Sequence, residues 1–339
     1  MSSATGKLDK VLARTRQRIE EGDYYEAHQA TRTVVARYVR TKQYDEAIKL
    51  LVHTAELLAK ANESSSACDL ILYLLDVYRK AGTSPTSAAK GELVQLVNQL
   101  NAGKEPLVKK IAAEAIQWSG SDSELHHVFG SKFARESAPD TYEAERHLLQ
   151  GTRESPRVLA TMLYTWATGP GTDADSKDKN NSTLLKESAA DVAAGLPLYL
   201  SRGVLGYLSA GNVRDARGVL QTFIEYVVAE HASNSALGQR LDYDRQEGSG
   251  SAVYVFKEVP LLNFLQLLVP TVQSKSPEMY NRLKARYAAL IDGLDAWKSV
   301  LAGIAELYCG IAPPRPQMNM LQDLLGSFMS GGGAGAIKN

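Results

Sequence analysis

The chain has 339 residues, of which 44% are hydrophobic and 22% are charged, and its 38 basic residues balance its 38 acidic residues. This composition is ordinary for a soluble globular protein, and zero net charge does not suggest nucleic acid or an anionic membrane as a partner. No apolar run approaches the roughly 20 residues that span a bilayer, and the amino terminus lacks a signal-peptide apolar region, so we expect a cytosolic protein that does not insert into membranes.

The first predicted helix, from about Lys7 to Glu21, has an apolar face and a basic face. Three basic side chains follow one another at helical spacing on its outer face: Lys10, Arg14 and Arg18. Such a stripe is either simply solvated or docks on an acidic partner surface. The pattern alone leaves both interpretations open.

A helix-start phrase occurs twice between residues 22 and 51, in GDYYEAHQATRTVVARYVRTKQYDEAIKLL. Tyr24 and Ala27 recur as Tyr44 and Ala47, a spacing of 44 − 24 = 20 residues, which is one helix plus its turn. Two such helices make a unit of about 40 residues, the size of a helical solenoid repeat. The alternative is a single amphipathic helical hairpin with nothing stacked on it.

Helical patterns continue along the rest of the chain. A fourth helix, over about residues 66–80, is apolar on several sides and is expected to lie between neighbours. Weaker copies of the repeated phrase occur around residues 142–144 and 215–216, and residues 168–183 are expected to form a surface loop. We therefore predict an all-α fold, a right-handed α-solenoid of antiparallel helix pairs similar to tetratricopeptide (TPR) or HEAT repeats, built as one elongated domain.

The helical pattern is interrupted between residues 241 and 259, where Gly248-Ser249-Gly250 precedes alternating apolar residues. This pattern predicts one small β-hairpin in the C-terminal half. An isolated hairpin is only marginally stable in water, so it either binds a partner or folds back on the solenoid. The pattern does not decide between these alternatives.

Three further segments follow the hairpin. Residues 260–273 are apolar nearly all round, as expected for a buried helix. Over residues 280–308 apolar side chains keep a three-four spacing, which predicts a long solenoid helix kinked near Gly293, with a coiled coil as the alternative. Residues 318–328 form a last amphipathic segment that has to bury its apolar face, before a flexible glycine-rich tail at 330–339.

The sequence offers no arrangement of residues typical of catalysis. It has no phosphate-binding glycine loop, no nucleophile elbow and no cysteine or histidine cluster at metal-ligand spacing. His126 and His127 are adjacent, so on a helix they point about 100° apart and cannot chelate one ion together. Cys68 and Cys309 lie in apolar helical surroundings and are expected to be reduced core residues. We expect a protein that is not an enzyme and binds no metal or cofactor.

Five blocks of sequence together resemble one protein family, in the same order along the chain. They are GDYYEAHQATRTVVARYVRTKQYDEAIKLL, CDLILYLLDVY, TYEAERHLLQGT, NFLQLLVPTVQ and NMLQDLLGSFMSGG. The blocks span nearly the whole chain and closely resemble the Golgi-to-ER traffic protein 4 family of the guided-entry pathway for tail-anchored membrane proteins, in particular its fungal members. The loop at 168–183 is longer than the family pattern leads us to expect.

The resemblance implies a non-catalytic cytosolic adaptor in the post-translational targeting of tail-anchored proteins to the ER. It implies a stable complex with a ubiquitin-like partner, guided-entry factor 5, and a transient complex with the dimeric targeting ATPase, guided-entry factor 3, which the adaptor regulates. The ubiquitin-like partner in turn recruits a glutamine-rich TPR cochaperone that carries the client. The rival interpretation is a generic helical-repeat scaffold subunit of another cytosolic complex.

The resemblance also implies a division of roles along the chain. Residues 1–150 are expected to bind the ATPase, and residues 151–329, with the hairpin, to hold the ubiquitin-like partner. Candidates for the ATPase-facing surface lie on the first two helices: Lys10, Arg14, Arg18, Tyr24, His28 and Arg40. Asp69 and Asp76 on the fourth helix are candidates for a second, regulatory contact with the ATPase. Candidates for the other surface lie on the hairpin and the helix that follows it: Val253, Tyr254, Val255, Phe256, Leu262, Phe264 and Leu265.

Overall fold

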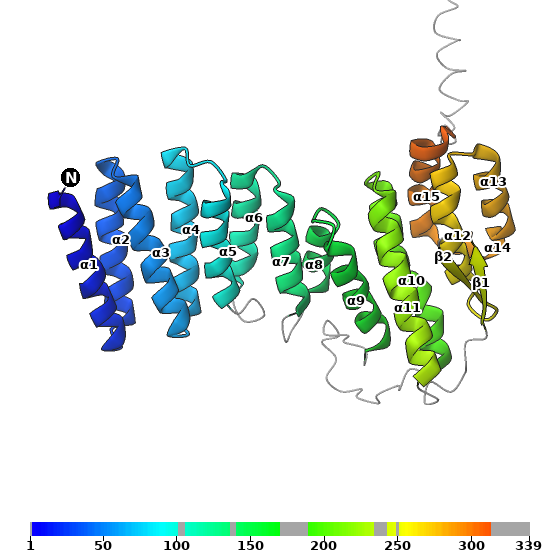
Figure 1. Ribbon diagram of the computed structural model, residues 1–339, viewed down its shortest axis with the longest axis horizontal. Helices are drawn as coiled ribbons and strands as arrows, with labels where there is room; N and C mark the ends of the chain where they lie inside the picture. Colours follow the sequence, from blue (N-terminus) through cyan, green and yellow to red (C-terminus); the bar gives the residue numbers. More distant parts are fainter. Residues whose placement is uncertain are drawn as a thin grey trace, which may run out of the picture. The chain divides into compact units, whose positions relative to one another are not determined.

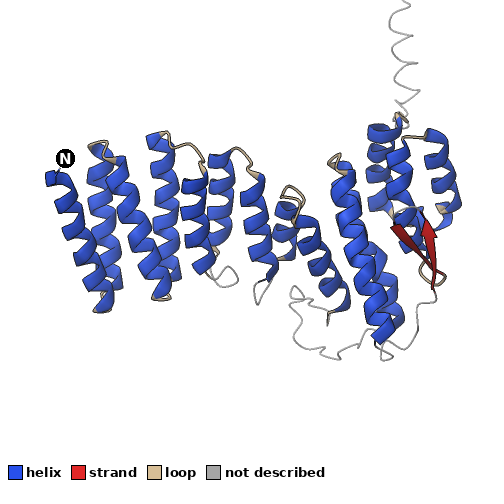
Figure 2. Ribbon diagram, in the orientation of Figure 1, coloured by secondary structure: helices blue, strands red, loops and turns tan. Residues whose placement is uncertain are grey.

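The computed structural model describes residues 2–100, 106–135, 140–169, 189–233, 243–248 and 251–312. In these ranges it contains the helices α1 to α15 and one antiparallel hairpin of two strands, β1 and β2 (Figure 1, Figure 2). The chain divides into two compact units. Unit 1 comprises Met1–Gly206 and Arg214–Arg240, and unit 2 comprises Tyr207–Val213 and Leu241–Asn339.

Unit 1 holds the first eleven helices, except for the last turn of α10 and the first residue of α11. Their bounds are α1 Ser2–Glu20, α2 Tyr24–Arg40, α3 Tyr44–Lys60, α4 Ser64–Ala81, α5 Ser87–Gln99, α6 Leu107–Ser119, α7 Ser123–Arg135, α8 Thr141–Leu148, α9 Ser155–Thr168, α10 Ala189–Ser209 and α11 Val213–Ser233. Unit 2 holds the hairpin and the last four helices. Their bounds are β1 Tyr243–Gly248, β2 Ser251–Phe256, α12 Pro260–Ser274, α13 Pro277–Arg286, α14 Ala288–Ile291 and α15 Asp295–Cys309.

The helices of unit 1 stack in two layers. In one layer α1 packs on α3, α3 on α5, α5 on α7 and α7 on α9, and in the other α2 packs on α4 and α4 on α6 (Figure 1). These contacts join helices that are one or two places apart in the sequence, which is the organisation of a helical solenoid. The all-α solenoid with one small hairpin, which the sequence predicts, is therefore confirmed.

The repeated phrase forms the turn between two helices and the first turn of the next helix. Ala27 of α2 and Ala47 of α3 are fully buried, so the absence of a longer side chain lets neighbouring helices approach closely. Before them, Gly22 and Lys42 have the left-handed backbone, with φ of 88° and 57°. In both turns the next residue's amide donates to a carbonyl five residues earlier, at 2.8 Å, which closes the helix end.

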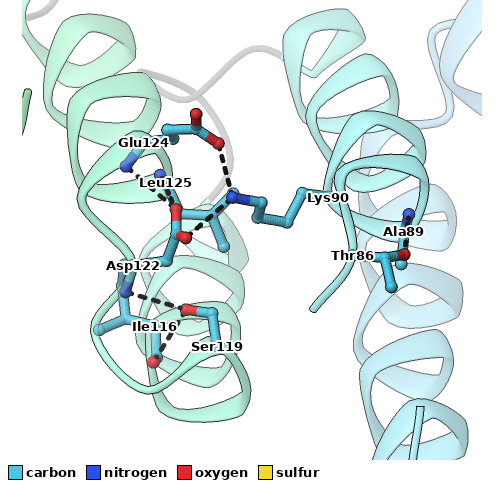
Figure 3. A network of polar contacts seen from close by, with 8 residues as sticks. All are labelled: Thr86, Ala89, Lys90, Ile116, Ser119, Asp122, Glu124 and Leu125. Carbon is cyan, nitrogen blue, oxygen red and sulfur yellow. Dashed lines mark hydrogen bonds and ion pairs between the residues drawn. The ribbon is translucent and has the colours of Figure 1, made fainter. Parts of the chain in front are cut away.

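A half-buried lysine joins α5 to the start of α7 (Figure 3). The Lys90 ammonium lies 2.8 Å from Asp122 Oδ2 and 2.5 Å from Glu124 Oε2. The other oxygen of Asp122 accepts hydrogen bonds from the amides of Glu124 and Leu125, at 3.0 and 3.2 Å, and so caps α7. Burial opposes ionisation of Asp122, but the Lys90 hydrogen bond and these amides hold its pKa below the usual value.

Helix α12 forms the centre of unit 2 and packs on α13, α15 and β2. The ring of Phe264 on α12 lies 5.5 Å from the ring of Tyr287 and 6.0 Å from that of Trp297, measured between centroids. The Tyr280 hydroxyl of α13 donates a hydrogen bond to the Leu301 carbonyl of α15 at 2.7 Å. Aromatic side chains therefore fill the space between the three helices.

The single long helix predicted over residues 280–308 is wrong, and so is the coiled-coil alternative. The segment divides into α13, α14 and α15, with breaks at Tyr287 and at residues 292–294, which include Gly293. Both α13 and α15 face the same core and pack on each other, which one straight helix cannot do. The apolar spacing therefore continues across the breaks although the helix does not.

The other helices and the cysteines agree with the sequence. The helices expected at about residues 7–21 and 66–80 are α1 and α4. Cys68 and Cys309 are buried, as predicted, and neither forms a disulfide in the described part of the chain. Within the described ranges, no helix combines the length and the apolarity needed to cross a membrane.

Several predicted segments fall outside the described residues. They are nearly all of the loop at 168–183, the amphipathic segment at 318–328 and the tail at 330–339. Neither boundary between the compact units falls at residue 150. The division there into two binding halves therefore remains a prediction about function.

Candidate protein-binding surfaces

The basic stripe predicted on the first helix lies along the solvent side of α1. Lys10 and Arg14 are exposed, whereas Arg18 is half-buried and donates a hydrogen bond to the Glu26 carbonyl at 3.5 Å. The opposite side of α1 is buried against α2 and α3. The three charges span eight residues, or about 12 Å along the helix axis. Two of them are free to contact a partner, and the third also joins α1 to α2.

The structure brings together two residues that the sequence assigned to separate contacts. His28 Nε2 on α2 lies 2.8 Å from Asp69 Oδ2 on α4, and Arg32 donates to the same carboxylate oxygen. The Arg32 guanidinium carbon lies 5.4 Å from the centroid of the Tyr73 ring, a cation–π contact. Burial would raise the pKa of Asp69, but the hydrogen bonds from Arg32 and His28 hold it below the usual value. We name these four residues the α2–α4 cluster.

The remaining candidates of this surface lie further apart. Asp76 lies two turns beyond Asp69 on α4 and forms a partly exposed ion pair with Lys80 at 2.6 Å, and this hydrogen bond raises the pKa of Lys80. Tyr24 is half-buried in the first turn of α2, and Arg40 is exposed in its last turn. These two lie sixteen residues apart, about 24 Å along the axis, so Arg40 is not part of the α2–α4 cluster.

Sequence analysis missed two members of the α2–α4 cluster and one exposed aromatic residue. Arg32 lies one turn after His28, and Tyr73 lies one turn after Asp69, so helical spacing from the chosen candidates could have found both. Tyr25, beside the half-buried Tyr24, is 70% exposed. The repeated tyrosines indicated packing between helices, and Tyr25, which is not repeated and faces solvent, was not chosen as a candidate.

The second candidate surface is the hairpin, and side-chain amides of α12 hold one edge of it. Asn263 accepts a hydrogen bond from the Phe256 amide at 2.8 Å and donates one to the Phe256 carbonyl at 2.7 Å. Gln266 does the same for Tyr254, at 3.1 and 2.9 Å. The two amide side chains thus take the place that a neighbouring strand would occupy, and the hairpin folds back on α12.

This arrangement leaves the outer edge of β1 as the open edge of the sheet. Tyr254 pairs with Arg245, and Phe256 pairs with Tyr243. The backbone N–H and C=O groups of Tyr254 and Phe256 point to α12, so they do not bond to the residues opposite them on β1. The pairs Tyr254–Arg245 and Phe256–Tyr243 are therefore the non-hydrogen-bonded pairs of the antiparallel ladder. The backbone groups of Tyr243 and Arg245 therefore point away from β2. The described sheet has two strands, so this edge carries no further strand of it.

Four of the hairpin-surface candidates lie in the core of unit 2. Phe256, Leu262 and Leu265 are fully buried, and Phe264 is 2% exposed. These residues hold the hairpin and α12 together, and their part in binding the ubiquitin-like partner stays a prediction. Val253, Tyr254 and Val255 are half-buried and keep part of their side chains available.

Comparison with known proteins decides the family. The family model described as Golgi to ER traffic protein 4 matches residues 41–329. The chain belongs to the Golgi to ER traffic protein 4 family. The Golgi to ER traffic protein 4 of Aspergillus fumigatus is 35% identical to it, over 97% of this chain and 91% of the relative. That of Schizosaccharomyces pombe is 32% identical, over 96% of both chains.

A solved structure and an animal relative agree with this family. The crystal structure of C. therm. Get4 is similar, with a TM-score of 0.77 and 33% identity, and the match covers 98% of this chain and 99% of that chain. The Golgi to ER traffic protein 4 homolog of Bos taurus is 23% identical, over 95% of this chain and 89% of the relative. Membership of the Golgi to ER traffic protein 4 family supports a role in ER traffic.

Proposed function

We propose that this chain is a non-catalytic adaptor in the targeting of tail-anchored membrane proteins to the ER. In this role it bridges a ubiquitin-like partner, with the client-loaded cochaperone that this partner recruits, to a dimeric targeting ATPase, and it regulates the ATPase. The protein works in the cytosol. The observation that carries the proposal is the charged surface at the start of unit 1, on a chain whose family is one of ER traffic factors.

The charged surface supports a transient, charge-guided contact with the ATPase. Lys10 and Arg14 on α1 are exposed cations, and Asp76 on α4 is a partly exposed carboxylate. Exposed charges of this kind raise association rates and set orientation more than they add affinity. The α2–α4 cluster links α2 to α4, which favours a constant arrangement of the charges on these helices.

The hairpin supports a stable contact with the ubiquitin-like partner. One edge of the sheet is held by Asn263 and Gln266, so a partner can reach the outer edge of β1 and the exposed parts of Val253 and Val255. Addition of an extended segment to an open strand edge is a common mode of peptide recognition. We infer that the partner adds to β1 and covers the two valines.

Charge reversal on α1 tests the ATPase contact. The double variant Lys10→Glu, Arg14→Glu should weaken ATPase binding, and the loss should be larger at low salt than at high salt because exposed charges are screened. Both side chains are exposed, so the helical circular-dichroism spectrum and the thermal midpoint should stay unchanged. Binding is measured by titration calorimetry at two salt concentrations.

The matched control reverses two exposed cations of unit 2. Arg282 and Lys284 lie on α13 and are exposed, so Arg282→Glu, Lys284→Glu changes the net charge by the same amount at a different place. Equal loss of ATPase binding in both variants would show that the change in net charge, and not the position of the charges on α1, causes the loss. Full affinity of the α1 variant for the ATPase at low salt would refute the ATPase contact at α1. If the native chain failed to capture the ubiquitin-like partner, the alternative of a scaffold subunit of another complex would be favoured.

A further inference from the structure

Aromatic side chains from three consecutive helices of unit 1 meet around one arginine. The guanidinium carbon of Arg202 on α10 lies 5.1 Å from the ring centroids of both Tyr142 on α8 and Trp166 on α9. The rings of Tyr142 and Trp166 meet edge to face at 5.2 Å, and the Trp166 ring lies 5.3 Å from that of Tyr199. Leu198 lies one turn before Arg202 on α10, on the same side of the helix. We call these five residues the α8–α10 patch.

The α8–α10 patch is open to solvent. Tyr142 is 66% exposed and Leu198 is 43% exposed, and in the described part of unit 1 the only other large apolar side chain with such exposure is Tyr25. The other three side chains of the patch are half-buried. Tyrosine, tryptophan and arginine are the residues most enriched at the energetic centres of protein interfaces. Their concentration at one exposed place indicates a protein-binding surface.

Arg202 is held in place and still has hydrogen-bond donors to offer. Its Nε and Nη2 atoms each lie 2.6 Å from Glu145 Oε2 on α8. A guanidinium has five N–H donors, so three of them have no acceptor in the described part of the chain. Among the described residues, the indole N–H of Trp166 and the hydroxyl of Tyr142 have no hydrogen-bond partner either. The patch therefore presents donors in fixed positions to a group that is rich in acceptors.

The charges at the edge of the patch favour a negatively charged ligand. The Arg202 side chain is 34% exposed, whereas that of its partner Glu145 is 15% exposed. Arg146, one turn after Tyr142 on α8, is 60% exposed, whereas its partner Glu143 is 28% exposed. In both ion pairs the cation is thus the more accessible member. A molecule that approaches this surface meets positive charge first, so charge complementarity favours an acidic partner.

We propose that the α8–α10 patch binds an acidic peptide segment of a partner protein. A carboxylate of the segment accepts hydrogen bonds from the Arg202 guanidinium, and an apolar side chain beside it packs on the rings of Tyr142 and Trp166. The two rings and Glu145 already fix the guanidinium, so binding costs little side-chain entropy. The patch shares no residue with the candidate ATPase surface or the hairpin, so this proposal does not rest on the proposed function.

A peptide titration of the full chain tests this binding. The probe is a fluorescein-labelled peptide with one phenylalanine flanked on each side by two aspartates, and its control has asparagine in place of every aspartate. The acidic peptide should bind at least about tenfold more tightly than the control, and its affinity should fall as salt is added. In a nitrogen-edited NMR spectrum the indole N–H signal of Trp166 should shift. The signal of Trp118, whose indole donates to the Thr83 carbonyl at 3.0 Å, should not.

Two variants with matched controls locate the binding on the chain. Tyr142→Ala removes the exposed ring and should weaken binding of the acidic peptide at least about tenfold. Tyr25→Ala removes a ring of similar exposure, at the same place in the repeated phrase, and should leave the affinity unchanged. Arg146→Gln should weaken binding at low salt, whereas Lys110→Gln, at an exposed position of α6, should not.

Four outcomes would overturn the proposal. No binding of the acidic peptide up to about 1 mM would show that the patch takes no such ligand. Equal affinity for the two peptides would show that the carboxylates are not recognised. Binding that leaves the Trp166 signal unshifted would place the peptide elsewhere on the chain. A Trp166 signal that shifts with protein concentration alone would assign the patch to a second copy. None of these outcomes bears on ATPase binding at α1 or on the hairpin.

Discussion

Two histidines of unit 1 meet in the core without a charged partner at hydrogen-bond distance. The Nδ1 atoms of His126 on α7 and His147 on α8 lie 3.0 Å apart, and the side chains are 4% and 1% exposed. One ring has to donate and the other to accept, so the pair shares one proton between the two nitrogens and is neutral. The Nε2 atoms of both rings are buried and have no hydrogen-bond partner in the described structure. The Glu143 carboxylate lies 3.9 Å from His147 Nε2, beyond hydrogen-bond distance, so burial still favours the neutral ring and lowers the pKa of His147.

This pair predicts a loss of stability in mild acid. Burial, the neighbouring His126 and Arg146 lower the pKa of His147 from 6.5 to about 4. Below pH 6.5 the unfolded chain binds a proton that the folded chain rejects, so the free energy of unfolding should fall between pH 6.5 and 4. The contribution of His147 is on the order of 3 kcal/mol at the lower end. Urea denaturation at several pH values measures it.

A double variant isolates this contribution from that of the carboxylates. His126→Leu combined with His147→Leu removes both partners at similar volume, which avoids leaving one buried polar group unpaired. Its free energy of unfolding should depend less steeply on pH between 6.5 and 4 than that of the native chain. An identical slope in the two proteins would show that the pair does not titrate in this window.

Residue pairings of this kind could not be predicted from the sequence. His28 and Asp69 were both chosen as candidates, yet they lie 41 residues apart and meet only because of the rotation of α2 against α4. Helical periodicity says which side of its own helix a residue occupies, but the angle between two helices depends on all of their packed side chains. Buried His147 shows the same limit, because its neighbours come from α7.

At the scale of the element, the hairpin depends on amide side chains of α12. Asn263→Ala removes both hydrogen bonds to Phe256, and we expect it to destabilise unit 2 by about 1 to 3 kcal/mol. The Phe256 amide should then exchange faster with solvent, as measured by hydrogen exchange. Gln273→Ala changes an exposed amide on the same helix and should have little effect. Unchanged exchange at Phe256 in the Asn263 variant would mean that other contacts hold the strand.

The repeated helix-start phrase shows which features of the turns between helices could be predicted from the sequence. The structure contains a third copy of the turn, in which Asn62 has a φ of 66° and Ala67 is fully buried, again 20 residues after Lys42 and Ala47. Sequence analysis overlooked it because Ser64 stands where Tyr24 and Tyr44 stand in the other copies. The turn needs a residue with a left-handed backbone and a buried alanine, but it does not need the tyrosine. The repeated tyrosines, which were the most conspicuous part of the phrase, are therefore not what forms the turn.

For the hairpin, the sequence predicted the strands but not their position against the rest of unit 2. Alternating apolar residues predicted the strand, but they could not decide between a protruding and a folded hairpin. That decision rests on Asn263 and Gln266, two polar residues in the first half of a helix that reads as apolar on nearly all sides. A buried amide three residues from another on a helix was the available signal, because a buried polar group needs a partner.

At the scale of the whole molecule, the proposed adaptor role requires that two binding surfaces act independently. The charged surface belongs to unit 1 and the hairpin to unit 2. A change confined to exposed atoms of one unit should therefore leave the other surface intact. Composition and periodicity predicted the solenoid, but they could not place the unit boundary, because helical stacking gives the same pattern on both sides of it.

The last prediction tests this independence in the full chain. Val255→Glu places a charge at a half-buried position of β2, opposite Asp244 of β1, and should release the ubiquitin-like partner while ATPase binding stays unchanged. Lys10→Glu, Arg14→Glu should do the reverse. Either variant should prevent the three proteins from co-eluting on a sizing column, although each keeps one binary complex. Loss of both binary complexes in one variant would indicate that the surfaces are coupled and would contradict a simple bridge.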